Sequence, residues 1–259
     1  MKYFIIVICF ISSSVCSQEK TDDVISFQTL FVQYTHSIHM ESLPNATIIN
    51  SYLTLNNSNS IYEMDFMNNR DAFSEDEYEE NEGKKGVLLS IKPKVNDFIF
   101  KNSKEKISYS VSRIGMEPFL IKDSDSIFEW LVSDEYKTIL GYKCQKATTN
   151  FRGRNYTAFF STDIPYQNGP WKFGNLPGLI LEVYSDDDVF KITANKLFTK
   201  NDIALAIENP FFKRLQESIS WDIFINKYKN KFNELKHYRL PKGGTMSIPK
   251  KGIEVYIEN

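Results

Sequence analysis

Between residues 26 and 199 the chain alternates short runs of apolar and β-branched residues with clusters of Asn, Ser, Asp and Gly. Alternation of apolar and polar positions is typical of half-buried strands, and the clusters between them are typical of turns. The expected strands span residues 26–38, 48–55, 60–67, 87–91, 97–100, 107–111, 119–122, 137–148, 156–161, 179–184 and 189–194. The pattern therefore predicts a string of antiparallel hairpins.

The residues between some of these strands predict the type of connection. Residues 56–59 (Asn-Asn-Ser-Asn) predict a tight hairpin turn, because Asn tolerates the backbone angles that turns require. Residues 71–85 crowd acidic side chains together, and we expect a mobile loop there because like charges repel. The apolar run at residues 127–131 is expected to end in a turn at residues 133–135.

After residue 199 the spacing of the apolar residues becomes that of an amphipathic helix. Apolar residues recur at three- and four-residue intervals on one face (Trp221, Phe224, Ile225, Tyr228, Phe232 and Leu235). We expect Ser220 to cap this helix, with Asp222 in its first turn, and Pro241 with the glycines after it to end it. Alternation at residues 253–257 predicts an edge strand in the tail.

Together these elements predict a mainly β protein of the α+β class. We expect a curved antiparallel sheet or half-barrel built from hairpins, with one amphipathic C-terminal helix packed on it. A closed barrel or a β-sandwich would accommodate the same strands. The composition agrees, because 14% of the residues are aromatic, including 20 Phe and 14 Tyr, and aromatic residues favour strands. Residues 18–259 show no repeat and no linker, so a single domain is expected.

The first seventeen residues have the features of a secretory signal peptide. One lysine precedes an apolar run at residues 3–11, small residues follow it, and cleavage is expected after Ser17, which leaves Gln18 as the N-terminus. Lipidation at Cys16 is the second interpretation, which we rank lower because Val15 is a poor neighbour for a lipidated cysteine. Removal of this leader leaves a net charge of about −3, too close to neutral to indicate a nucleic-acid partner.

Motifs of the common catalytic and cofactor sites are absent from the sequence. It lacks the Gly-x-Ser-x-Gly of serine hydrolases, the His-Glu-x-x-His of zinc peptidases and the Gly-rich patterns of nucleotide-binding loops. His36 and His39 would point to opposite faces of a strand, so we expect no metal and no cofactor. A hydrolase whose carboxylates are distant in sequence remains the third interpretation of function.

Three side chains are candidate contacts. Cys144 is the lone thiol of the mature chain; Lys143 and Lys146 flank it in sequence without facing it, so we favour a small buried residue over a reactive thiol. Arg152 and Arg154 lie in a predicted turn. Their guanidinium groups could bind a carboxylate or phosphate bidentately, although hairpin arginines that face only water are the preferred interpretation.

The most constrained stretch of the chain leads into the strand that ends at residue 184. It consists of Gly169, Pro170, Trp171, Lys172, Phe173, Gly174, Asn175, Leu176, Pro177, Gly178, Leu179 and Ile180. Proline restricts the backbone, glycine permits angles that other residues avoid, and the large apolar side chains favour burial. We therefore expect a shaped, buried or half-buried turn.

Together with residues 141–147 (GYKCQKA), 151–156 (FRGRNY) and 161–165 (STDIP), this stretch closely resembles the GLPGLI family of exported Bacteroidota proteins, named after that hexapeptide. Residues 136–184 carry nearly all of the resemblance. Asn175 stands where the family name has its first glycine, so Asn must supply the positive φ there. The resemblance implies export and carries over no catalytic or cofactor residue. On fold analogy alone, it also implies a curved sheet with a helix across its concave side, similar to periplasmic lipid and lipoprotein carriers.

Our leading hypothesis is an exported, non-enzymatic binding or carrier module of the periplasm or outer envelope. Its apolar groove would hold a small ligand, lipid or peptide, with residues 169–180 as a wall or rim. The alternative is an accessory or scaffold subunit of an outer-membrane transporter or secreted enzyme, docking through an acidic region at residues 63–82 and a basic region at residues 191–251. For the motif itself, we favour a fold-defining corner over a ligand-contacting surface.

Overall fold

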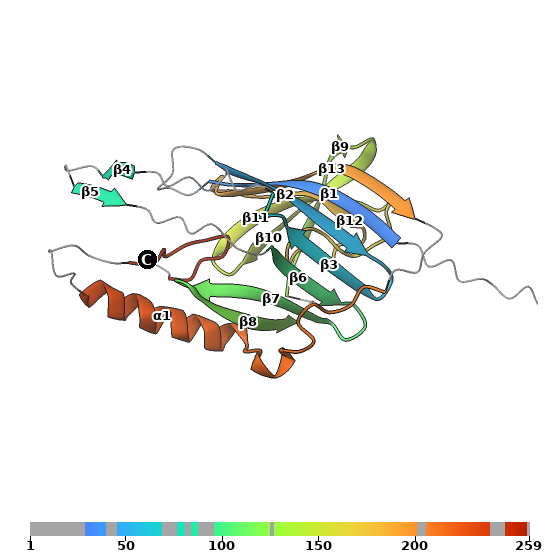
Figure 1. Cartoon of the computed structure of the whole chain (residues 1–259). Helices are drawn as coiled ribbons and strands as arrows, with labels where there is room; N and C mark the ends of the chain where they lie inside the picture. The colour runs from blue at the N-terminus through green and yellow to red at the C-terminus, as the bar shows by residue number, and fades with distance from the viewer. Residues whose placement is uncertain are drawn as a thin grey trace, which may run out of the picture.

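The computed structural model describes residues 29–39, 46–68, 77–80, 84–87, 96–124, 127–200, 206–238 and 247–257, with the backbone alone at 77–80 and 84–87. The predicted leader and most of the predicted strand at residues 87–91 lie outside these ranges. Within them the chain is mainly β, with one long helix near the C-terminus, as the sequence predicts (Figure 1).

Eleven strands form a single antiparallel sheet in the order β8-β7-β6-β3-β2-β1-β13-β12-β11-β10-β9. Their bounds are β1 Thr29–Ile38, β2 Thr47–Leu55, β3 Asn59–Met64, β6 Asp97–Asn102, β7 Ile107–Ile114, β8 Glu117–Ser124, β9 Leu131–Ile139, β10 Tyr142–Phe151, β11 Arg154–Ser161, β12 Leu179–Ser185 and β13 Phe190–Lys200. A separate two-stranded sheet, β4 (Glu77–Glu80) with β5 (Lys84–Val87), lies in and just beyond the acidic stretch for which charge repulsion predicts a loop.

The large sheet consists of two meanders that meet where β1 pairs with β13. One meander runs outward from β1 to β8, and the chain then crosses to β9 through a connection that includes residues 127–130. The other returns from β9 to β13, which pairs with β1 from Thr29 opposite Lys200 to Ile38 opposite Phe190. The edge strands β8 and β9 do not pair with each other, so the sheet is open and curved instead of a closed barrel (Figure 1).

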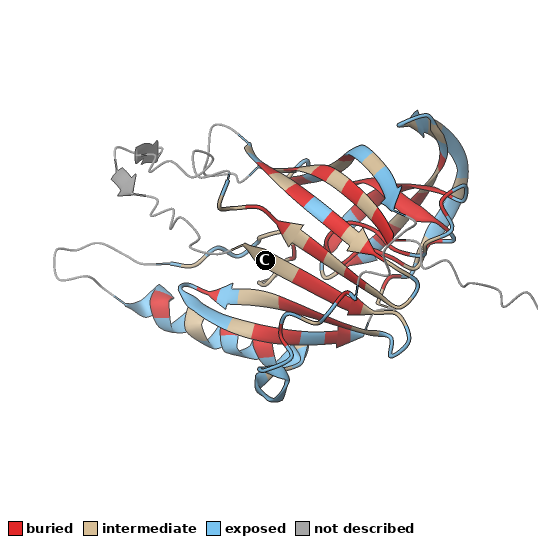
Figure 2. Cartoon of the chain, turned by 45° about the vertical axis from the view of Figure 1, so that its right-hand side comes forward, coloured by how far each residue is buried: buried red, intermediate tan, exposed pale blue. Residues whose placement is uncertain are grey.

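One face of this sheet encloses the main hydrophobic core. On β1, Leu30, Val32 and Tyr34 are buried, while the residues between them are half-buried. Figure 2 shows the same alternation of buried and more exposed positions along most strands. The period-two pattern therefore specifies which face of each strand turns inward.

The predicted helix is α1 (Trp221–His237), and it begins where the sequence predicts. Ser220 Oγ accepts a hydrogen bond from the backbone N–H of Ile223 and so caps the first turn. Phe224 packs with Ile121 of β8, on the same side of the sheet as the core. No helix in the described ranges is both long and apolar enough to cross a membrane.

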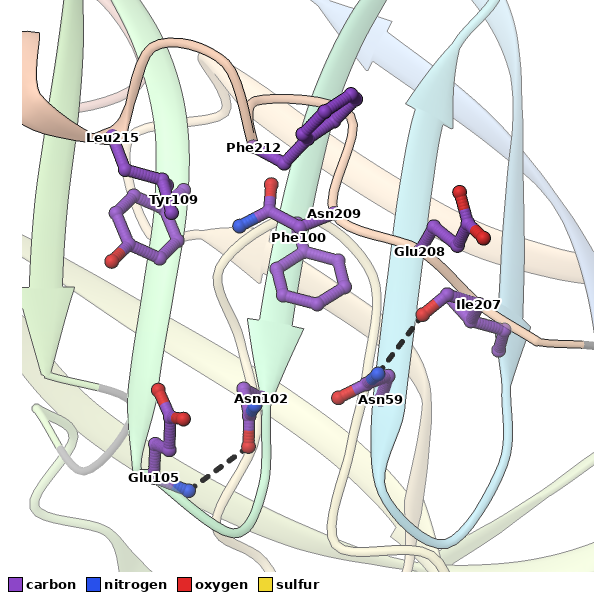
Figure 3. Close-up of a pocket in the computed structure, with 10 residues that line it drawn as sticks. All are labelled: Asn59, Phe100, Asn102, Glu105, Tyr109, Ile207, Glu208, Asn209, Phe212 and Leu215. Carbon is purple, nitrogen blue, oxygen red and sulfur yellow. Dashed lines mark hydrogen bonds between the residues drawn. The ribbon is translucent and has the colours of Figure 1, made fainter.

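A second cluster covers part of the opposite, outer face. Phe100 of β6 and Tyr109 of β7 are register partners, and they pack with Ile207 and Phe211. These last two residues belong to the segment at 206–214, which precedes the short 3-10 helix η2 (Leu215–Glu217) and crosses over the strands (Figure 3). The segment therefore creates a small interior on the outside of the sheet.

Four local predictions were wrong, one of them the loop at residues 71–85, where β4 pairs with β5. The run at residues 137–148 is two strands, because Leu140 and Gly141 form a turn with φ of +52° and +85°; the turn expected at residues 133–135 lies inside β9. Leu140 adopts a left-handed conformation that glycine usually supplies, so the apolar run extends into the turn and only Gly141 interrupts it. In the tail, residues 253–257 form no edge strand; an isolated bridge pairs Lys251 with Val255.

Candidate binding site on the outer face

The predicted motif, residues 169–180, forms the last part of the connection from β11 to β12 and the first two residues of β12. Trp171, Phe173 and Leu176 are buried. The ring centroid of Phe173 lies 5.0 Å from that of Tyr156 in an edge-on contact. These side chains fill the concave face of the sheet, and none of them lines the larger pocket described below.

Backbone constraints explain the shape of the motif. Asn175 has φ of +65°, as expected for a residue that stands in place of glycine, and it also lines a small pocket of about 170 Å³. A Cβ atom on Gly178 would lie 2.1 Å from the carbonyl oxygen of Ser161, so only glycine fits there. Trp171 has φ of +50°, a strained state held by the packing of its buried ring.

Two polar side chains on β3 and β6 anchor the motif to the sheet. Lys101 is only 1% exposed, and its Nζ donates hydrogen bonds to the backbone oxygens of Gly169 (3.3 Å) and Phe173. The same Nζ donates to Asn168 Oδ1 at 3.1 Å, and Asn168 Nδ2 donates to Ser60 Oγ at 2.9 Å. A lysine in a strand normally faces solvent, so nothing in the sequence marks Lys101 for this role.

Arg152 binds carboxylates of the protein itself. Its Nη2 lies 2.7 Å from Asp123 Oδ1, and its Nη1 contacts Glu254 Oε1. The guanidinium carbon stands 3.6 Å from the ring centroid of Trp221. Lys172 of the motif shares Glu254, with Nζ 3.0 Å from both carboxylate oxygens. Two cations and two anions thus form a buried ionic cluster that joins the motif, β8, the β10–β11 turn and the C-terminal segment.

Arg154 also points inward. The residue is buried, and its Nη1 donates to the backbone oxygens of Gly252 at 2.7 Å and Ile253 at 3.1 Å. Its Nε lies 3.2 Å from Asp187 Oδ2. The preferred interpretation, that these hairpin arginines face only water, was therefore wrong for both, because their guanidinium groups bind groups of the protein itself. Neither presents an open guanidinium fork to an external anion.

Cys144 is fully buried, and burial raises the pKa of its thiol to about 11. The flanking lysines contact other groups: Lys143 Nζ lies 4.0 Å from the ring centroid of Tyr136, and Lys146 Nζ lies 2.9 Å from the carboxylate of Glu135. A thiol with this pKa stays protonated at neutral pH and is a poor nucleophile.

The histidines form no metal site within the described ranges. His36 is fully buried, with its ring 4.8 Å from that of Phe190. His237 is exposed at the end of α1, where Nδ1 lies 2.8 Å from the carbonyl oxygen of Asn233. In the described part of the chain, no three His, Cys, Asp or Glu side chains gather as metal ligands.

A pocket of about 540 Å³ opens on the outer face, between the strands and the segment at 206–215 (Figure 3). Phe100 and Tyr109 are buried in its wall, whereas Phe212 is 62% exposed. Volumes of roughly 300 to 1,000 Å³ are typical of small-ligand sites. The lining residues are Asn59, Phe100, Asn102, Glu105, Tyr109, Ile207, Glu208, Asn209, Phe212 and Leu215.

Three amides in this pocket have fixed orientations and unused hydrogen-bonding groups. Asn59 Nδ2 donates to the carbonyl oxygen of Ile207 at 2.9 Å, which leaves Asn59 Oδ1 buried without a donor from the described residues. Asn102 Oδ1 and Asn209 Oδ1 each accept a backbone N–H of the following turn at 2.9 Å, so their Nδ2 groups are the ends left without a partner among the residues that the structure describes. Figure 3 shows the oxygen of Asn59 turned away from Ile207. The pocket therefore offers one acceptor and two donors.

The pocket and the motif use opposite faces of the same two strands. Asn59 on β3 lies opposite Asn102 on β6, and the adjacent Ser60 lies opposite Lys101. Because successive side chains of a strand point to opposite faces, the first pair lines the pocket and the second pair holds the motif. The sequence predictions did not include the pocket residues, which come from separate segments and carry no local motif.

Part of this chain is similar to one known kind of domain. A family model described as "N-glycanase peptide, N-terminal domain" matches residues 93–217, a little under half of the chain. This range contains every pocket-lining residue except Asn59.

Two solved structures of PNGF-II, in space groups C2 and P21, are similar to this chain with TM-scores of 0.49 and 0.48 and 15% identity. The matches cover 78% and 79% of this chain but 32% and 34% of those chains, so this chain spans about a third of their length. No curated protein matches.

Proposed function

We propose that the chain is an exported, non-enzymatic binding module whose ligand occupies the outer-face pocket. The observation that carries the proposal is the set of three oriented amides with free hydrogen-bonding groups beside the aromatic side chains Phe100, Tyr109 and Phe212. A few fixed polar groups orient a ligand, while aromatic rings supply contact area. The proposed site therefore lies outside the motif, whose apolar side chains fill the core.

Two further observations support the proposed location of this module and its role beside an enzyme. The predicted leader at residues 1–17 and the resemblance to the GLPGLI family support export to the periplasm or outer envelope. The match of residues 93–217 to an N-terminal domain of N-glycanase supports an accessory role beside a catalytic domain. On this proposal the module binds a ligand near the place where a separate enzyme domain acts.

Ligand-observed NMR on the chain purified from an exporting host tests the proposal. Four pools should be screened: neutral oligosaccharides, acidic oligosaccharides, lysine-rich peptides and short-chain phospholipids. At least one pool should give a binding signal that Phe212→Ala weakens. Phe198→Ala is the matched control, because Phe198 is also an exposed ring (42%) but does not line the pocket. No signal from any pool, or a signal that Phe212→Ala leaves intact, would overturn the proposal.

A second candidate function, docking on another envelope protein, is favoured by the edge strand β9, which pairs with β10 alone among the described strands. Leu131, Val132 and Tyr136 on this edge strand are 76%, 49% and 48% exposed. An exposed apolar edge offers unpaired backbone groups to a partner strand. A photocrosslinker at Tyr136 in exporting cells should give one dominant product. Equal labelling from a crosslinker at Phe198, or no product, would exclude this candidate.

A further inference from the structure

We propose that the ligand of the outer-face pocket is a neutral oligosaccharide. This inference rests on the binding function proposed above and names its ligand class. Three properties of the pocket select that class: its aromatic surface, its uncommitted hydrogen-bonding groups and its mixed charge.

The aromatic surface suits a sugar ring. A pyranose carries hydroxyl groups around its edge and C–H groups on its faces, so it stacks on an aromatic ring while its edge remains free for hydrogen bonds. Phe212 is 62% exposed and lines the pocket, and Phe100 contributes a second ring. Tyr109 adds a ring that carries a hydroxyl group. The pocket thus places apolar and polar contacts side by side, as a sugar does.

The free amide groups call for a ligand that both donates and accepts. Asn59 Oδ1 needs a donor, whereas Asn102 Nδ2 and Asn209 Nδ2 need acceptors. A hydroxyl group satisfies either need, because it has one donor and two acceptor positions. An acyl chain would cover all three amides without pairing any of them, and unpaired buried polar groups weaken binding. The amides therefore favour a polyhydroxylated ligand over a lipid tail.

The charges near the pocket strongly favour ions of neither sign. Glu105 and Glu208 line it without any basic residue, so sialylated or uronate-containing sugars would meet like charge. Lys213 Nζ lies 5.5 Å from the ring centroid of Phe212, and this cation beside the exposed ring offsets part of the attraction that the two carboxylates have for a basic peptide. A neutral ligand depends on neither effect.

A glycan array followed by calorimetry on the exported chain tests this inference. The array carries neutral and acidic oligosaccharides, each free and attached to a short peptide, so that recognition of the sugar alone is separated from recognition of a glycopeptide. Neutral glycans should bind in both forms. Their affinity should not change between about 50 mM and about 500 mM salt, because no charge pairs form.

Matched variants locate the binding. Asn102→Asp and Asn209→Asp keep the oxygen that accepts from the turn and remove the Nδ2 donor, so each should weaken neutral-glycan binding roughly tenfold. Asn150→Asp adds the same charge on an exposed hairpin that does not line the pocket, and it should leave binding unchanged. Phe212→Ala should weaken binding by a similar factor.

The outcomes separate this inference from the function on which it rests. Pocket-dependent binding of an acidic sugar, a basic peptide or a lipid in place of neutral glycans would overturn the saccharide assignment and leave the binding module standing. Neutral glycans that bind with full affinity to the pocket variants would overturn the assignment of the site. An absence of binding to any ligand class would overturn both.

Discussion

Acid should destabilise the protein through one buried imidazole, that of His36 on β1. The side chain is fully buried, its ring packs edge-on against Phe190, and neither ring nitrogen has a hydrogen-bond partner among the described residues. Burial disfavours the charged form and lowers the pKa of His36 from 6.5 to about 3. The folded protein therefore keeps this ring neutral over a pH range in which the unfolded chain binds a proton.

The sign and size of the effect follow from proton linkage. Below about pH 6.5 the unfolded state binds one proton more than the folded state, so stability falls as the pH falls, until His36 protonates in the folded state near pH 3. Each pH unit inside this window removes about 1.4 kcal/mol. Moving from about pH 7.5 to about pH 5 should therefore remove about 2 kcal/mol of unfolding free energy through this residue.

Urea unfolding followed by tryptophan fluorescence at both pH values measures this difference. His36→Phe removes the titrating group and suits the site, because the cross-strand partners of His36 are Ile49 and Ile192. This variant should lose about 2 kcal/mol less than the wild type between the two pH values. His237→Gln removes an exposed imidazole and controls for the loss of a histidine as such. Equal pH dependence in the wild type and His36→Phe, or an NMR titration of the folded His36 ring near pH 6.5, would refute the reasoning.

Three further experiments probe the anchor of the motif, its glycine at position 178 and the thiol of Cys144. Lys101→Met should lower the free energy of unfolding by about 3 kcal/mol, because the backbone oxygens of Gly169 and Phe173 lose the Lys101 donor and Asn168 Oδ1 keeps only the N–H of Gly169; a urea midpoint close to that of the wild type would contradict this. Gly178→Ala should cost more than about 3 kcal/mol, since its Cβ would lie 2.1 Å from a backbone oxygen. By contrast, Gly115→Ala, with open space around it and φ of +61°, should cost only about 1 kcal/mol in the same assay. Cys144 should react with a thiol reagent only as fast as the protein unfolds, because it is buried and its pKa is about 11, and labelling at the rate of a free thiol would show otherwise.

Predictions of secondary structure held where local pattern and tertiary packing agree. Ser220 begins α1 because its hydroxyl caps the first turn and the apolar face that follows packs on β8. The turn between β9 and β10 was missed for the opposite reason. Gly141 marks the turn, but Leu140 before it takes a positive φ that its own chemistry disfavours, and the apolar run continues up to the glycine, so the pattern predicts one strand.

The contacts of the predicted site residues depend on pairings across the whole chain. Arg152 was expected to face water, but its guanidinium group binds the carboxylates of Asp123 and Glu254, 29 and 102 positions away in the sequence. The outer-face pocket is harder still to anticipate. Its defining property is hydrogen-bonding capacity left over after folding, and only the folded contacts of Asn59, Asn102 and Asn209 show which amide groups remain free.

The arrangement of β3 and β6 separates what holds the fold together from what binds a ligand. On the inner side, Ser60 and Lys101 hold the motif; on the outer side, the adjacent Asn59 and Asn102 line the pocket. The motif can then influence binding only by fixing the two strands relative to each other. Loosening the Lys101 anchor should lower both stability and affinity, whereas Phe212→Ala should lower affinity with little change in stability, because that ring is mostly exposed. The buried motif thus gives the pocket its geometry, and the outer residues give it its chemistry.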